Sequence, residues 1–127
     1  MSFAQPTQSE LKPSILIVDD DSIILEILGK GFNMCGFKVF TAENGVDALQ
    51  LFKRERINIV LTDIYMPGKI DGTQLSTLIH RQSPDTTIAA MTGGNGEVGR
   101  ILLKKGIVDH LFIKPFAISY ACKTLIG

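Results

Sequence analysis

Apolar residues recur along this chain in two patterns, one typical of β-strands and one typical of α-helices. Short apolar runs typical of β-strands occur at 14–19, 37–42, 57–63, 86–92 and 110–116. Segments with apolar residues at helical spacing follow them at 21–35, 44–56, 71–82, 96–106 and 117–127. The runs at 14–19 and 57–63 are continuous, as in strands buried on both faces. Five strands that alternate with five helices predict an α/β protein with a parallel sheet covered on both sides.

Polar residues predict where several helices begin and end. Asp21 or Ser22 is expected to cap the first helix, and Asn44 the second, because their side chains accept backbone N–H groups at a helix start. Gly36 is a stop signal. Residues 1–12 are polar and contain one proline, with another at position 13. We therefore expect a flexible leader over 1–12 and one folded domain over 13–127.

Composition narrows the class of protein. Hydrophobic residues make up 45% of the 127 residues, enough for a core. Thirteen basic and thirteen acidic residues balance, which argues against nucleic-acid binding by this domain alone. No membrane span or secretion signal is visible, so we expect a cytoplasmic protein. Two cysteines are too few for a disulfide framework, and both Cys35 and Cys122 are predicted to be small core residues.

Reactive side chains collect at the predicted carboxyl ends of the strands, where open α/β sheets bind ligands. Asp19 and Asp20 end the first strand, Asp63 the third, Thr92 the fourth and Lys114 the fifth. Clustered carboxylates repel each other, and a divalent cation such as Mg²⁺ relieves that repulsion with oxygen ligands. A lysine and a hydroxyl beside them suit a phosphoryl group. Asp63 would be the nucleophile that becomes an acyl phosphate.

The segments "ILIVDDDS", "TAENGVDALQLF", "IVLTDIYMPG", "MTG" and "FIKPF" together resemble the receiver domain of bacterial two-component response regulators. The resemblance covers about 14–127. It implies the flavodoxin-like (βα)5 fold, a three-layer sandwich with strand order 2-1-3-4-5. It also implies a phosphorylation-dependent signalling switch rather than an enzyme with its own substrate. The phosphodonor would be a histidine kinase or a phosphotransfer protein.

Matched residue by residue, the resemblance implies the parts of the site. Asp63 would be the phosphoacceptor. Asp20 and Asp63 would ligate Mg²⁺ directly, together with the main-chain carbonyl of Tyr65, and Asp19 would act through water. The phosphoryl group would contact the residues that follow the last two strands, namely Thr92, the amide of Gly93, and Lys114.

Around the last strand, one expected feature follows the family pattern and one residue departs from it. The resemblance implies a cis bond between Lys114 and Pro115, a form that costs little only before proline. The family usually has an aromatic residue three positions before the lysine, where this sequence has Leu111. An aromatic readout of phosphorylation is therefore not predicted from these residues.

Other functions fit parts of the sequence. "ILIVDDDS" also resembles the opening motif of haloacid dehalogenase phosphatases, with Asp19 as nucleophile and Asp21 as acid/base. That family needs a later acidic pair, and 115–127 contains neither Asp nor Glu. A receiver-like interaction module that is never phosphorylated is a further alternative. Gly94, Gly96 and Gly99 have dinucleotide-loop spacing, but they follow the fourth strand rather than the first.

The last two helices are expected to carry a contact surface. Helical spacing turns Ala121, Cys122 and Leu125 inward and Ile118, Tyr120 and Ile126 outward. Leu103 adds an apolar residue on the preceding helix. Apolar residues that are exposed together on neighbouring helices are typical of interfaces. We therefore predict a homodimer or effector contact through these two helices.

Overall fold

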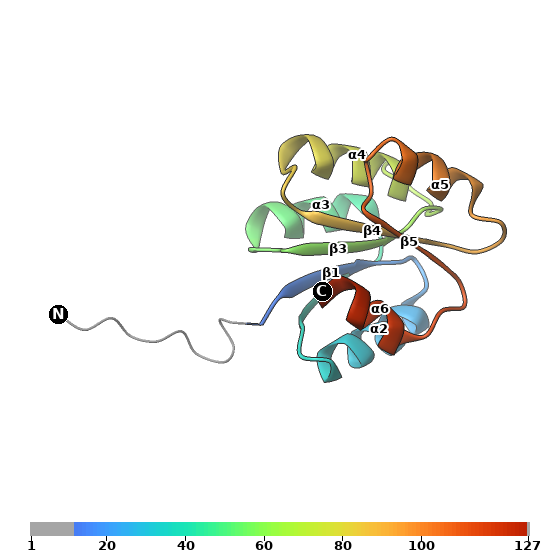
Figure 1. The fold of residues 1–127 in the computed structure, drawn as a ribbon. Helices are drawn as coiled ribbons and strands as arrows, with labels where there is room; N and C mark the ends of the chain where they lie inside the picture. The colour runs from blue at the N-terminus through green and yellow to red at the C-terminus, as the bar shows by residue number, and fades with distance from the viewer. Residues whose placement is uncertain (1–11, 127) are drawn as a thin grey trace.

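The computed structural model describes residues 12–126, which form a five-stranded parallel sheet with helices on both faces (Figure 1). Residues 1–11 of the predicted leader lie outside the described part of the chain. The strands are β1 (Ser14–Val18), β2 (Lys38–Ala42), β3 (Ile59–Asp63), β4 (Thr87–Thr92) and β5 (His110–Ile113). The helices are α2 (Ser22–Met34), α3 (Gly45–Arg54), α4 (Gly72–Gln82), α5 (Glu97–Lys104) and α6 (Ile118–Ile126).

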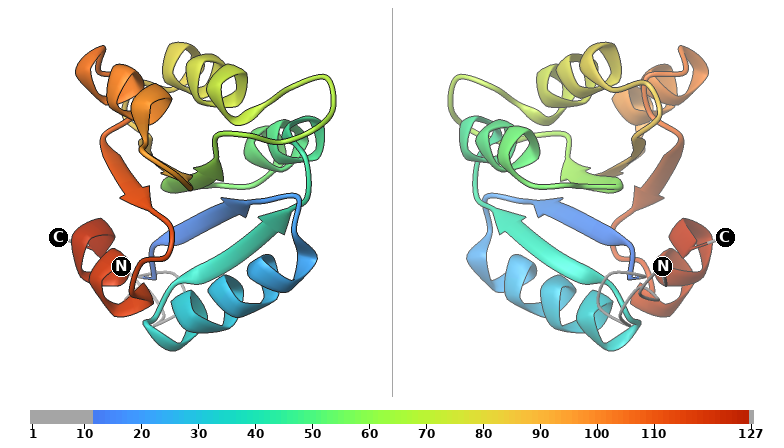
Figure 2. Two further views of the ribbon diagram at one scale, coloured as in Figure 1. Left: turned by 90° about the vertical axis from the view of Figure 1, so that its right-hand side faces the viewer. Right: turned by 90° about the vertical axis from the view of Figure 1, so that its left-hand side faces the viewer.

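The strand order is β2-β1-β3-β4-β5, and every neighbouring pair is parallel. The flavodoxin-like three-layer fold is thereby confirmed. Helices α3, α4 and α5 cover one face, and α2 and α6 cover the other (Figure 2). The order reverses at β1 and β3, which lie side by side in the middle of the sheet. Ligands of such sheets bind at this switch point, beyond the carboxyl ends of the strands.

Two apolar clusters, one on each face of the sheet, hold the layers together. Alternation along the strands divides their side chains, so that Ile15 and Ile17 of β1 face α2 and α6, whereas Leu16 and Val18 face the other helices. All four side chains are fully buried. Burial on both faces explains why β1 is a continuous apolar run rather than an alternating one.

Polar side chains cap the N-termini of α2, α3 and α4, which follow β1, β2 and β3 in the chain. Asp21 accepts hydrogen bonds from the backbone N–H groups of Ile23 and Ile24, which confirms it as the N-cap of α2. Asn44 caps α3, as predicted. Asp71 forms a capping box with Gln74 at the start of α4. These caps place each helix N-terminus close to the strand that precedes it.

The structure corrects one expectation for α2 and shows which of its faces is buried. Its apolar residues do not all face the core, because Ile23, Ile27 and Met34 are 68%, 56% and 87% exposed. The buried face consists of Leu25, Leu28 and Phe32. Cys35, predicted to be a core residue, is exposed at the C-cap of the helix. The helical period was right, but it did not decide which of two apolar stripes would be buried.

The last helix largely follows the prediction. Ala121, Cys122 and Leu125 are buried, and Tyr120 and Ile126 are 61% and 60% exposed. Ile118 was expected to face outward, and that prediction is wrong, since it packs against the α2–α6 cluster. The reason lies in Gly31 of α2, where a Cβ would stand 2.8 Å from the Ile118 side chain. The missing side chain lets α6 approach α2 closely.

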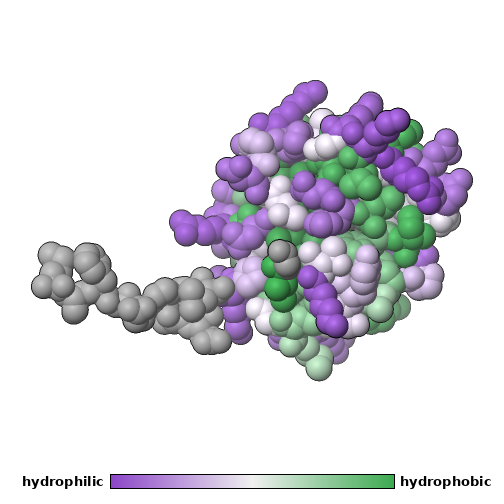
Figure 3. Space-filling view, viewed as in Figure 1, coloured by the Kyte–Doolittle hydropathy of each residue, from purple (hydrophilic) through white to green (hydrophobic). Residues whose placement is uncertain are grey.

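Within residues 12–126, no helix is both long and apolar enough to cross a membrane. Apolar residues nevertheless remain on the surface. Seen from the side of α5, β5 and α6, hydrophobic residues gather between bordering polar ones (Figure 3). The exposed apolar residues on α5 and α6 are Ile101, Leu103, Tyr120 and Ile126.

Candidate functional site

Strand alternation brings three charged side chains to the same side of the sheet. Asp19 follows β1 in the phase of Ile17, and Asp63 ends β3 in the phase of Leu61, both of which belong to the cluster under α2 and α6. Lys114 follows β5 in the phase of Phe112, which belongs to the same cluster. The three side chains meet beyond the carboxyl ends of the strands, where the sheet no longer separates the two layers of helices.

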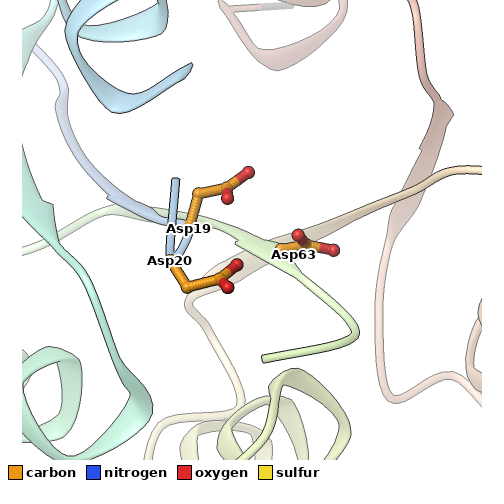
Figure 4. A group of neighbouring side chains, drawn as sticks. All are labelled: Asp19, Asp20 and Asp63. Carbon is orange, nitrogen blue, oxygen red and sulfur yellow. The ribbon is translucent and has the colours of Figure 1, made fainter. Parts of the chain in front are cut away.

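The acidic residues form a compact group. Asp19, Asp20 and Asp63 each offer a carboxylate oxygen within 4.8 Å of the other two (Figure 4). Asp19 is buried, Asp63 is half-buried and Asp20 is exposed. The side chain of Asp19 is only 1% exposed, and that of Asp63 is 13% exposed. The group is therefore open to solvent on the Asp20 side and closed toward the sheet.

Lys114 joins two of these carboxylates. Its Nζ donates to Oδ2 of Asp19 at 2.8 Å and to Oδ2 of Asp63 at 3.3 Å. The backbone N–H of Lys114 donates to the carbonyl of Thr92 at 2.7 Å, which fixes the start of the loop. The Lys114–Pro115 bond is cis, as the resemblance implied. The sequence predicted that Lys114 would lie near these carboxylates, but not that it would pair with both Asp19, which lies 95 positions away in the chain, and Asp63.

The environment shifts the pKa of two of these groups. Burial raises the pKa of Asp63, Lys114 opposes that change, and the charge of Asp19 adds to it. Burial by itself would lower the pKa of Lys114, but the hydrogen bond from its ammonium to Asp19 and the charges of both carboxylates raise it instead. Lys114 therefore stays charged at neutral pH, and one cation faces three carboxylates.

This donor set suits Mg²⁺. Within residues 12–126, three carboxylates converge beside one cation, Lys114, which leaves an excess of negative charge, and hard oxygen ligands are those that Mg²⁺ prefers. Asp20, on the exposed side, leaves room for the waters that Mg²⁺ usually retains. The residues present thus fit a magnesium ion, with Asp19, Asp20 and Asp63 in reach of it.

The other predicted site residues lie around this group. Thr92 is buried at the end of β4, and its hydroxyl donates to the carbonyl of Gly93 at 3.1 Å. A Cβ added to Gly93 would meet nothing within 4 Å, so space is open beside its backbone. The N–H of Tyr65 donates to Oδ1 of Asp63 at 3.4 Å, and the Tyr65 side chain is 63% exposed. The roles given to these residues remain predictions.

A close backbone contact supports the acceptor loop and was missed by sequence reasoning. Gly72 begins α4, and its N–H donates to the carbonyl of Ile64 at 2.9 Å. A Cβ on Gly72 would lie 1.8 Å from the carbonyl oxygen of Asp63. Only glycine allows this approach. The sequence signal was the pair Asp71–Gly72, which marks a helix start but does not say what lies against it.

An apolar groove opens beside the charged group and was also missed. Its volume is about 450 Å³, and it lies between α2 and the segment that leads from β5 into α6. The lining residues are Ile24, Ile27, Leu28, Lys114, Pro115, Phe116 and Ile118. The available signal was the surplus of apolar residues at positions 23–28, which is wider than one buried helix face requires.

The phosphatase alternative loses its acid/base in this arrangement. Asp21 would be the acid/base of that mechanism. Its Oδ1 accepts hydrogen bonds from two backbone N–H groups of α2. Asp19, its nucleophile, is buried and paired with Lys114. Asp63, which the alternative leaves without a role, is half-buried beside the same lysine. Both carboxylates thus contact the same lysine, and Asp63 is the more exposed of the two.

Leu111 occupies the position where the family usually has an aromatic residue. It is half-buried against the cluster under α3, α4 and α5. A Cβ on Gly99 of α5 would lie 2.4 Å from its Cδ1. Leu111 therefore packs into the space that Gly99 leaves in α5.

The fold and the acidic group define a class of signalling domain, and comparison with known proteins identifies the family. The family model for the response regulator receiver domain matches residues 15–125. The chain belongs to this family. Receiver domains generally bind Mg²⁺ at such an aspartate cluster, and they serve signalling.

Several proteins with known sequences are similar to this chain. The transcriptional regulatory protein PrrA of Mycobacterium tuberculosis is 30% identical over 107 residues, which cover 84% of this chain and 46% of PrrA. The probable transcriptional regulator ycf27 of Galdieria sulphuraria is 39% identical over 107 residues, 84% of this chain and 41% of that protein. The chain thus spans less than half the length of these relatives.

Solved structures agree with the fold. The response regulator receiver domain protein of Clostridium thermocellum superposes with a TM-score of 0.80 at 25% identity, over 91% of this chain and 99% of that one. A CheY-like receiver domain protein of Methanospirillum hungatei gives a TM-score of 0.83 at 25% identity, over 91% of both chains.

Proposed function

We propose that this domain is a switch that accepts a phosphoryl group on Asp63, in a Mg²⁺-dependent reaction, from a phosphohistidine of a histidine kinase or phosphotransfer protein. The observation that carries the proposal is the contact of Lys114 with both Asp19 and Asp63. A lysine that bridges a buried and a half-buried carboxylate at the switch point of the sheet holds positive charge where a transferred phosphoryl group would arrive.

The chain's own residues account for the transfer. An oxygen of Asp63 would attack phosphorus as the bond from phosphorus to the donor histidine nitrogen breaks, which leaves an acyl phosphate and a neutral histidine. Lys114 would pair with the phosphoryl oxygens and keep its contact with Asp19. Thr92 would turn its hydroxyl from Gly93 toward the phosphoryl group, and the amide of Gly93 would donate a further hydrogen bond.

The metal would be held by the acidic group. Asp20 and Asp63 are proposed as direct ligands with the main-chain carbonyl of Tyr65, and Asp19 as a ligand through water. When bound, Mg²⁺ supplies positive charge that offsets the negative charge of the carboxylates and the transferring group. Burial raises the pKa of Asp63, so a bound cation would favour the ionised form that can attack.

The apolar groove beside Lys114 would receive the phosphodonor protein. Ile27, which is 56% exposed, and Lys114 both line the groove. A partner surface that buries Ile27 would therefore hold its phosphohistidine next to Asp63. Exposed apolar residues that gather around a reactive group are typical of a docking surface.

A small phosphodonor tests the acceptor without any partner. The protein is incubated with acetyl phosphate and Mg²⁺, and its intact mass is measured. We expect a gain of one phosphoryl group, which EDTA and Asp63→Asn each abolish. Asp85→Asn is the matched control, because Asp85 is an exposed carboxylate that precedes β4, at the opposite end of the sheet from the acidic group. A gain that survives Asp63→Asn would refute the assignment.

A second measurement tests the docking surface separately. Ile27→Glu should slow transfer from a phosphorylated kinase or phosphotransfer protein but leave the reaction with acetyl phosphate unchanged. Met34→Glu is the control on the same helix, since Met34 is 87% exposed and does not line the groove. Equal loss of both reactions in Ile27→Glu would mean that the substitution disturbs the fold rather than docking.

Signal output is proposed to use the α5–β5–α6 side. Leu103 is 41% exposed on α5, and Tyr120 and Ile126 are exposed on α6. The names of PrrA and ycf27 describe transcriptional regulators. For this chain we propose that phosphorylation changes self-association or effector binding through these helices.

A further inference from the structure

Two cysteines that are far apart in the sequence are neighbours beneath the sheet. Gly31 of α2 and Ile118 of α6 are in close contact, since a Cβ on Gly31 would lie 2.8 Å from the Ile118 side chain. Cys35 and Cys122 each follow these residues by four positions, which is one helical turn on the same face. Because both helices follow strands of the same parallel sheet, they run in the same direction, and the turn after this contact brings the two cysteines to the same side of the α2–α6 contact.

The two thiols differ in exposure. Cys122 is 3% exposed and belongs to the cluster that contains Phe32 and Phe37. Cys35 is exposed at the C-cap of α2, and both cysteines are free. Burial, and then the neighbouring Cys35 thiol, raise the pKa of the Cys122 thiol to about 12. Cys122 is thus sheltered from solvent but open toward Cys35.

We propose that Cys35 and Cys122 form a reversible redox site, in which a small disulfide such as oxidised glutathione converts the two thiols into a disulfide that links the end of α2 to α6. The exposed thiolate of Cys35 attacks the glutathione disulfide, forms a mixed disulfide and releases one reduced glutathione. The Cys122 sulfur then attacks the Cys35 sulfur, loses its proton to solvent and releases the second glutathione. Two electrons and two protons pass from the protein to the oxidant.

The arrangement has the features of a sensor rather than of a structural bond. Reactive sensor thiols are exposed and lie next to a resolving cysteine, as Cys35 lies next to Cys122. A sheltered resolving thiol makes the second step slow, because thiolate is the attacking form and little of it is present at neutral pH. The mixed disulfide on Cys35 should therefore appear first and decay into the intramolecular bond.

The disulfide would link α6 covalently to the end of α2. Cys122 lies on the helix that also presents Tyr120, and Cys35 ends the helix that presents Ile27 to the groove. Cross-linking residues so far apart in sequence restricts the unfolded chain strongly. We expect the oxidised protein to melt at least about 5 °C above the reduced one.

The test uses the full chain in its native state. The protein is incubated with oxidised glutathione, quenched in acid, denatured and treated with N-ethylmaleimide, and its intact mass is followed with time. We expect a transient single glutathione adduct, then a monomer that has lost two hydrogens and takes up no maleimide. Dithiothreitol should return both thiols. In Cys35→Ser, Cys122 should stay reduced and react with maleimide only after denaturation.

Three results would overturn the proposal. The first is a stable glutathione adduct on Cys35 that never resolves. The second is a disulfide-linked dimer through Cys35 in place of the intramolecular bond. The third is an oxidised monomer with a lower Tm than the reduced protein, because the bond would then distort the contact between α2 and α6 rather than match it.

Discussion

Removing the charge of Asp63 should stabilise the metal-free domain, and the structure allows the magnitude of this effect to be calculated. At an effective dielectric constant of about 20, the attraction between Lys114 and Asp63 across 3.3 Å is about 5 kcal/mol. Repulsion between Asp63 and Asp19, with oxygens within 4.8 Å, is about 3.5 kcal/mol. Asp20 is exposed, so screening leaves roughly 1 kcal/mol of its repulsion.

These attractive and repulsive energies nearly cancel. The cost of burying the Asp63 charge therefore decides whether its removal stabilises or destabilises the protein. That cost is roughly 1–2 kcal/mol for a carboxylate so placed. It agrees with the raised pKa of Asp63, for which burial is the largest cause. Asp63→Asn keeps the shape of the side chain and removes the charge. We expect it to raise the free energy of unfolding by roughly 1–2 kcal/mol in EDTA at pH 7, and the Tm by about 4–10 °C.

The dependence on pH has a definite sign. A carboxyl group whose pKa is raised by folding favours the folded state while it is protonated, and loses that contribution as pH rises. The unfolded chain ionises Asp63 near its ordinary value of 3.8, and the folded protein does so at higher pH. The advantage of Asp63→Asn over the wild type should therefore be small below pH 3.8, grow above it, and level off once the folded protein has ionised.

Urea unfolding of both proteins between pH 3.5 and 8, in EDTA, measures this difference, with Asp85→Asn as the matched control. Saturating Mg²⁺ should narrow the gap, since the cation stabilises the folded wild type more than the variant. Two results would refute the reasoning that burial of the Asp63 charge costs stability. One is destabilisation by Asp63→Asn in EDTA, and the other is a stability advantage of the variant over the wild type that does not change with pH.

Three further outcomes are expected. Tyr65→Asn should speed hydrolysis of the phosphorylated protein, because the tyrosine beside the acceptor would shield it from water; Tyr65→Phe is the control, and an unchanged rate in Tyr65→Asn would reject shielding. Gly72→Ala should lower the free energy of unfolding by about 3 kcal/mol or more, since its Cβ would lie 1.8 Å from the Asp63 carbonyl, whereas Gly29→Ala should be neutral or stabilising, because its Cβ meets its neighbours at 3.8 Å. Denaturant titrations compare the two, and equal effects would contradict the close approach. Tyr120→Glu should prevent any self-association induced by beryllofluoride in sedimentation runs; if both forms of the wild type stay monomeric at high concentration, the α5–β5–α6 side serves a different partner or none.

The sequence by itself determined the alternation of strands and helices and most of the helix ends. These features depend on neighbours within a few residues, such as Asp21 with the N–H groups of Ile23 and Ile24. It also determined that acidic residues follow two apolar strands. Asp63 stood out because a carboxylate at the end of a buried strand is costly unless its charge is used. The strand order came from resemblance to a family, and the structure confirms it.

Only the tertiary structure decided which apolar face of α2 is buried and which long-range pairs form. Helical periodicity shows that a face of α2 is apolar, but it does not distinguish between two apolar faces. Packing against the neighbouring helix decides, and the missing side chain of Gly31 lets Ile118 cover one of the two faces. The ion pair between Lys114 and Asp19 depends in the same way on how distant elements pack. Such pairs follow from how the strands and helices pack in the open sheet, which no local pattern in the chain encodes.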